Sequence, residues 1–127
     1  MPAVKILTTL PFVTITYPLE WTSSDHAEAL RALGAVLAKS QAAVLCDCRH
    51  ARPPTALERK ALTDLIEKHK ASFLGLAWVT DSVIARHIMG IVMWAFPQAF
   101  PAAPFTDPLE ARLYLEQCLS GQQRRAS

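Results

Sequence analysis

The sequence predicts an α/β protein with a mixed, mostly parallel five-stranded sheet and four helices. The first observation is the order β-β-α-β-α-β-α-β-α, in which short apolar or β-branched segments alternate with helical ones. Helices between consecutive strands imply right-handed crossovers and parallel neighbours. The second observation is that the first two strands have no helix between them, which predicts an antiparallel hairpin at one edge of the sheet.

The predicted hairpin occupies residues 4–10 and 12–17, joined by a tight turn. In its second strand Val13, Ile15 and Tyr17 alternate with threonines, so one face is apolar. A short, continuous apolar run at 42–48 is typical of a strand covered on both faces. The remaining two strands are predicted at residues 73–80 and 103–106.

Capping signals mark where the helices begin. Asp25 with Glu28 three residues later has the spacing of a capping box, and Ser24 is an equally good cap. Thr55 with Glu58 is a clean capping box. The helices are predicted at residues 25–39, 55–70, 83–96 and 108–119.

Three of these helices have one apolar side that we expect to face the core. The predicted core residues are Leu30, Leu33, Val36 and Leu37, then Leu57, Ala61, Leu62, Leu65, Ile66 and His69, and in the last helix Leu109, Leu113, Leu115, Cys118 and Leu119. Ser120 and Gly121 are expected to end the last helix. We therefore predict one domain over residues 1–121 and a flexible polar tail at 122–127.

The third helix is unusual because only Arg86 and His87 are clearly polar in it. One side, expected to face the core, contains Ile84, Ile88, Ile91, Val92 and Ala95. The remaining apolar surface needs a partner, a ligand or a lid, because an ordinary surface helix has a solvated face. The residues predicted to form this surface are Arg86, Met89, Gly90, Met93, Trp94 and Phe96.

Composition excludes several classes of protein. A net charge of +2 without a basic run interleaved with aromatics argues against nucleic-acid binding. No apolar run approaches the roughly 20 residues of a transmembrane helix, and the start lacks the features of a signal peptide. Three cysteines, an odd number, favour free thiols in a reducing compartment. We therefore expect a cytoplasmic protein.

Arg49, His50 and Arg52 precede the predicted start of a helix, where free backbone N–H groups favour an anion. One interpretation is a phosphate or acidic-partner site with Thr55 as a phosphoacceptor and Ser82 on the same rim of the sheet. The alternative is that Thr55 only caps the helix and that the arginines are solvated.

Chemistry beyond binding has little support in the sequence. Cys46, Cys48 and His50 alternate along one strand, but this is not a usual zinc spacing. Cys48 is a slightly better candidate for a reactive thiol near a helix N-terminus. Ser82 and His87 have residue types of a hydrolase, yet no Gly-x-Ser-x-Gly elbow or glycine-rich phosphate loop is present. We predict no metal, no cofactor and no enzymatic activity.

Four short motifs resemble the SpoIIAA-like fold of STAS domains (sulfate transporter and anti-sigma-factor antagonist), and in particular small stand-alone bacterial proteins of that group. The motifs are Val44-Leu45-Cys46-Asp47, Pro54-Thr55 with Glu58-Arg59-Lys60-Ala61, Leu76-Ala77-Trp78-Val79-Thr80-Asp81-Ser82 with Ala85-Arg86, and Phe105-Thr106-Asp107 with Glu110-Ala111 and Leu115. The resemblance extends over residues 12–119 and implies the SpoIIAA-like arrangement of the predicted sheet.

What the resemblance implies for function is a regulatory or binding module. In anti-sigma-factor antagonists a strand-ending aspartate precedes a phosphorylatable serine, and here Asp47 matches the strand end and Thr55 the approximate position. The Asp-Ser-Ser-Gly motif itself is missing. The related CRAL-TRIO-type domains, which carry lipids, imply instead an apolar ligand under a helix.

We therefore expect a non-enzymatic module that contacts a regulatory protein and forms a homodimer through the third helix, because exposed patches of Met and aromatic residues are typical of interfaces. The alternative is a carrier or sensor of a lipid or other apolar small molecule in a cavity under this helix.

Overall fold

The structure is a computed structural model that describes residues 4–52, 54–94 and 100–126. For residues 88, 89, 91–94 and 122–126 it describes the backbone alone.

The predicted mixed five-stranded sheet is confirmed. Its strands lie in the order β1-β2-β3-β4-β5, with β1 antiparallel to β2 and every other neighbouring pair parallel. The strand bounds are β1 Lys5–Thr9, β2 Phe12–Thr16, β3 Ala42–Asp47, β4 Phe73–Val79 and β5 Ala102–Phe105. Because β2 to β5 run in the same direction, the loops that follow them share one rim.

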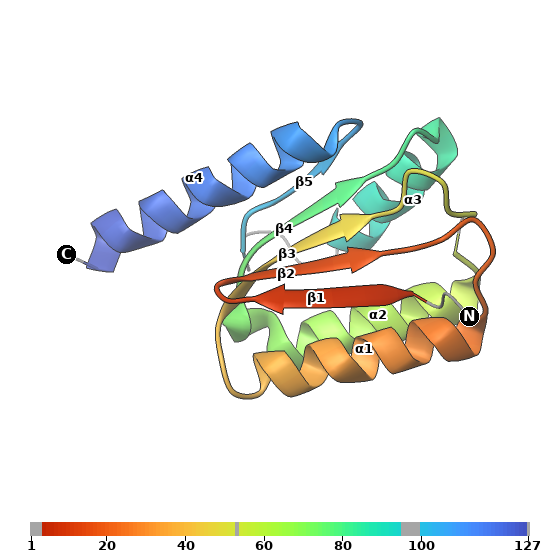
Figure 1. Cartoon of the computed structure of the whole chain (residues 1–127), viewed down its shortest axis with the longest axis horizontal. Coiled ribbons are helices and arrows are strands. Elements are labelled where there is room, and N and C mark those ends of the chain that lie inside the picture. The colour runs from red at the N-terminus through yellow and green to blue at the C-terminus, as the bar shows by residue number, and fades with distance from the viewer. Residues whose placement is uncertain (1–3, 53, 95–99, 127) are drawn as a thin grey trace.

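Helices cover both faces of the sheet (Figure 1). Helices α1 and α2 pack against one face, α4 lies across the other face over β3, β4 and β5, and α3 contacts β5. The helices are α1 Ser23–Leu37, α2 Ala56–His69, a short 3₁₀ helix at Lys70–Ser72, α3 Val83–Trp94 and α4 Pro108–Ala126.

Each face of the sheet has its own core. The larger core, under α1 and α2, includes Ile15, Leu33, Val44 and Trp78. The smaller core, under α4, is formed by Ala43, Leu45, Ala77, Val79, Ala111 and Leu115. Alternation along β3 sends successive side chains into opposite cores, which is why its sequence is a continuous apolar run.

Gly75 in β4 allows α4 to lie close to the sheet. A Cβ atom at this position would be 3.2 Å from both the Cys118 Sγ and a methyl carbon of Leu115. Any larger residue would push the helix outward, so the small core depends on a glycine here.

The start of α1 differs from the prediction. Thr22 is the N-cap, and its hydroxyl accepts from the Asp25 backbone N–H at 3.1 Å while the Asp25 carboxylate accepts from the Thr22 N–H at 3.0 Å. Asp25 is therefore the third residue of the capping box, so the expectation of Asp25 or Ser24 as the cap is wrong. Thr55 and Glu58 form the predicted box at α2.

Several predicted core residues are exposed. Leu57, Ile84, Leu109 and Leu113 lie mostly in solvent, Ile84 with 67% of its surface exposed. The apolar side predicted for α4 is wrong because it included both Leu113 and Leu115. Two residues along an α-helix correspond to a rotation of about 200°, so Leu113 cannot share a face with the buried Leu115. In α3 the buried residue of the first turn is Ala85, next to Ile84.

Helix α4 continues through Ser120 and Gly121 to Ala126, beyond its predicted end. Gly121 does not adopt the left-handed conformation of a helix cap, since no glycine in the described ranges has a positive φ. The flexibility of residues 122–127 stays a prediction. None of the helices in the described ranges is both long and apolar enough to cross a membrane.

A buried apolar cavity as the candidate functional site

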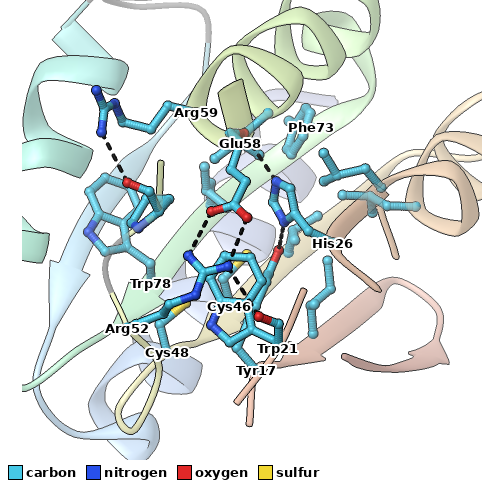
Figure 2. Close-up of a pocket in the computed structure, with 17 residues that line it drawn as sticks. Tyr17, Trp21, His26, Cys46, Cys48, Arg52, Glu58, Arg59, Phe73 and Trp78 are labelled. Carbon is cyan, nitrogen blue, oxygen red and sulfur yellow. Dashed lines mark hydrogen bonds and ion pairs between the residues drawn. The ribbon is translucent and has the colours of Figure 1, made fainter. Parts of the chain in front are cut away.

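A cavity of about 60 Å³ lies between the sheet and the helices α1 and α2. Figure 2 shows it with its lining side chains. Its apolar wall includes Ile15, Leu30, Leu33, Val44, Leu62 and Leu76, and its aromatic wall Tyr17, Trp21, Phe73 and Trp78. Strands β2 and β3 place every second side chain on this face. Strand β4 adds Phe73, Leu76 and Trp78 across a register shift, so three neighbouring strands contribute to one apolar surface.

A buried hydrogen-bond chain runs along one side of the cavity. The Tyr17 hydroxyl lies 2.7 Å from His26 Nδ1, and His26 Nε2 lies 3.1 Å from the backbone oxygen of Glu58. A carbonyl oxygen can only accept, so Nε2 carries the proton and Nδ1 of the neutral ring accepts from Tyr17. Burial lowers the pKa of His26, which favours this neutral form.

Glu58 is the buried charge of the site and is 2% exposed. Its carboxylate accepts from Arg52 at 2.8 and 2.9 Å, from the Ser23 hydroxyl at 2.7 Å and from the Thr55 backbone N–H at 2.8 Å. The bidentate Arg52 guanidinium is the main cause that holds the Glu58 pKa well below its usual range. The group is therefore ionised, fully hydrogen-bonded and structural.

Arg52 also ties the loop before α2 to the segment before α1. Its guanidinium lies 3.8 Å from the centre of the Trp21 ring and donates to the Trp21 backbone oxygen at 3.1 Å. Trp21 in turn meets Tyr17 edge to face, with ring centres 4.9 Å apart. Arg52 thus connects the first turn of α2 to the segment that precedes α1.

The two thiols in the cavity wall are not activated. Burial raises the pKa of Cys46 to about 12 and that of Cys48 well above its usual value. The hypothesis of a reactive Cys48 is therefore wrong, because a helix N-terminus lowers a thiol pKa only where the thiolate is solvated or paired. Over the described ranges, no group of three His, Cys, Asp or Glu side chains could hold a metal ion.

Arg59 and Trp78 form another part of the lining. Arg59 donates to the Pro54 backbone oxygen at 3.1 Å. The indole N–H groups of Trp21 and Trp78 are buried, and neither has a hydrogen-bond partner in the part of the chain that the structure describes. A buried donor without a partner costs about 1–3 kcal/mol, so an acceptor brought to this wall would be stabilising.

The predicted anion site lies on the rim formed by the ends of β3 and β4. Asp47 holds Arg49 through two hydrogen bonds of 3.0 Å, and Glu58 holds Arg52. Thr55 acts as the cap of α2, and the Ser82 hydroxyl accepts from the Ala85 backbone N–H at 3.1 Å. His50 is exposed. These residues share a rim as expected, but carboxylates already hold both arginines; anion binding and phosphorylation stay predictions.

The predicted surface on α3 is only partly within the described side chains. Gly90 is exposed, and a Cβ atom added there would meet nothing within 4 Å. Arg86 is half-buried, and its Nε has no hydrogen-bond partner among the described residues. Phe96 and the side chains of Met89, Met93 and Trp94 lie outside the described residues. The exposed side of α3 includes Val83, Ile84 and His87.

Tyr17, Trp21 and His26 were not predicted as a group. Tyr17 ends an alternating strand, Trp21 lies in a connection and His26 is in the first turn of a helix, so no spacing relates them. A usable signal was the presence of three aromatic or imidazole rings within ten residues of a predicted strand end.

Comparisons with known proteins identify the fold of this chain. No protein-family model matches the chain, and no curated protein matches it. Among solved structures it is similar to an uncharacterised protein from the DUF3478 family with a SpoIIAA-like fold, from Shewanella loihica. The two are 17% identical, with a TM-score of 0.68 over 89% of this chain and 92% of the other. This chain is a small protein with a SpoIIAA-like fold, as the sequence motifs predicted.

Proposed function

We propose that this protein is a non-catalytic binding domain that holds part of a small apolar molecule between the sheet and the helices α1 and α2. The observation that carries the proposal is the apolar and aromatic cavity in this layer. Packed interiors have few voids larger than a water molecule, and apolar cavities stay dry and take apolar ligands. The cavity lies under α1 and α2, whereas the sequence analysis predicted a cavity under the third helix.

The chemistry of the lining supports binding over catalysis. Both ring nitrogens of His26 are engaged, and every oxygen of the Glu58 carboxylate accepts two hydrogen bonds. The raised pKa of Cys46 keeps its thiol protonated near neutral pH. A general base or nucleophile needs a lone pair that can reach a substrate, and these three groups do not offer one.

Size limits what the cavity takes. A cavity of about 150 Å³ holds a whole benzene molecule, whereas this one measures about 60 Å³. We therefore expect it to bury a short alkyl chain or one edge of a ring, with the rest of the ligand outside.

Filling the cavity should remove binding. Leu30→Phe adds volume to the cavity wall and is expected to weaken the binding of hexanamide, an uncharged probe with a short chain, at least tenfold by isothermal calorimetry. Leu119→Phe is the matched control, because Leu119 packs in the core on the other face of the sheet. Undetectable binding of hexanamide to the wild type, or equal binding to Leu30→Phe, would contradict the proposal.

A second candidate is a regulatory module that forms a homodimer through α3. It is favoured by the exposure of Val83, Ile84 and Gly90 in α3. The absence of a side chain at Gly90 would let a partner helix approach closely. Light scattering should then give twice the mass of one chain, and Ile84→Glu should give monomers. Leu57→Glu, at a leucine of α2 that is even more exposed than Ile84, should leave the mass unchanged. A monomeric wild type at high concentration excludes this candidate.

A further inference from the structure

We infer that the ligand of the cavity carries an oxyanion at one end, such as the carboxylate of a short fatty acid or the phosphate of an alkyl phosphate, and that Arg59 pairs with it. The inference rests on the proposed function and adds the chemical class of the ligand. It starts from an imbalance of charge around the cavity.

Two arginines, Arg52 and Arg59, line the cavity, and the nearby Arg49 follows the end of β3. Two of these three pair with carboxylates. Asp47 pairs with Arg49 at 3.0 Å, and Glu58 pairs with Arg52 at 2.8 Å. Arg59 donates to the backbone oxygen of Pro54, which is a neutral group.

Within residues 4–52, 54–94 and 100–126, no acidic side chain forms an ion pair with Arg59. All 11 Asp and Glu side chains lie within these residues. A guanidinium has five N–H donors in a planar fork that matches carboxylate and phosphate oxygens. One bond to a carbonyl therefore leaves both charge and donors for a ligand.

Arg59 lies where such a head group would be needed. It lines the apolar cavity and is half-buried, so it can contact a ligand chain inside and an oxyanion at the rim. In Figure 2 its guanidinium points away from Glu58. It is also in the first turn of α2, where the helix dipole favours negative charge.

Four probes with the same six-carbon chain test the charge. Hexanoate or hexyl phosphate is expected to bind the wild type roughly tenfold more tightly than hexanamide, as a charge-assisted hydrogen bond would give. Hexylamine is expected to bind more weakly than hexanamide, because its cation would lie beside Arg59. Calorimetry in low salt gives all four dissociation constants.

Arg59→Gln should remove the preference for the anions, so that hexanoate, hexyl phosphate and hexanamide bind the variant with similar dissociation constants. Arg31→Gln on α1 is the control, because Arg31 is exposed and does not line the cavity. Circular dichroism confirms that each variant is folded. Equal binding of hexanoate, hexyl phosphate and hexanamide, or an anion preference that survives Arg59→Gln, overturns this inference alone. Undetectable binding of hexanamide to the wild type overturns the proposed function as well.

Discussion

Glu58→Gln is expected to lower the free energy of unfolding by about 2–3 kcal/mol at pH 7. Removing one partner of a buried ion pair costs about 3–5 kcal/mol, because the other charge is left uncompensated. The side chain of Arg52 is 37% exposed, so water can solvate part of its charge, and we expect a loss at or just below the lower end of that range. Urea denaturation followed by circular dichroism measures the change.

Glu67→Gln is the matched control for this substitution. Glu67 is in the same helix as Glu58 and forms an ion pair at 3.3 Å with Lys70, the C-cap residue of that helix, but both side chains are exposed. An exposed pair contributes about 0–1 kcal/mol, so the control should stay within about 0.5 kcal/mol of wild type. Equal losses in both variants would show that the buried pair is not a stabilising feature of the site.

The same pair predicts how stability depends on pH. The pKa of Glu58 is lowered in the folded protein from a usual value of 4.5, so its contribution is complete above that value. As pH falls below 4.5, the unfolded state binds a proton that the folded state resists, and stability decreases. The difference between wild type and Glu58→Gln should therefore shrink between pH 5 and pH 3.

Local patterns were sufficient to predict most of the fold. Alternation in β2, the continuous apolar run of β3 and the Thr55–Glu58 box each depend on neighbours in sequence, and the structure confirms all three. The direction of β1 followed from the missing helix between β1 and β2.

The cavity could not be predicted because its parts are distant in sequence. His26 and Glu58 are 32 residues apart and meet only when α1 packs beside α2. Arg52 and Glu58 are close in the sequence, so their pairing could have been expected. Their contacts with Ser23 and Trp21 could not, because those residues are about 30 positions away. An unfilled volume depends on how side chains from five elements pack, and no periodicity encodes it.

Leu115→Ala is expected to lower the free energy of unfolding by about 3 kcal/mol, within the range of about 2–5 kcal/mol for a fully buried leucine. Leu115 of α4 is 1% exposed and packs against Gly75 of β4. Leu113→Ala, in the same helix and of the same chemistry, is the control, because Leu113 is 51% exposed. It should cost less than about 0.5 kcal/mol. Urea denaturation of both variants distinguishes the two orientations of α4, because a helix turned with Leu113 toward the sheet would reverse the order of the two losses.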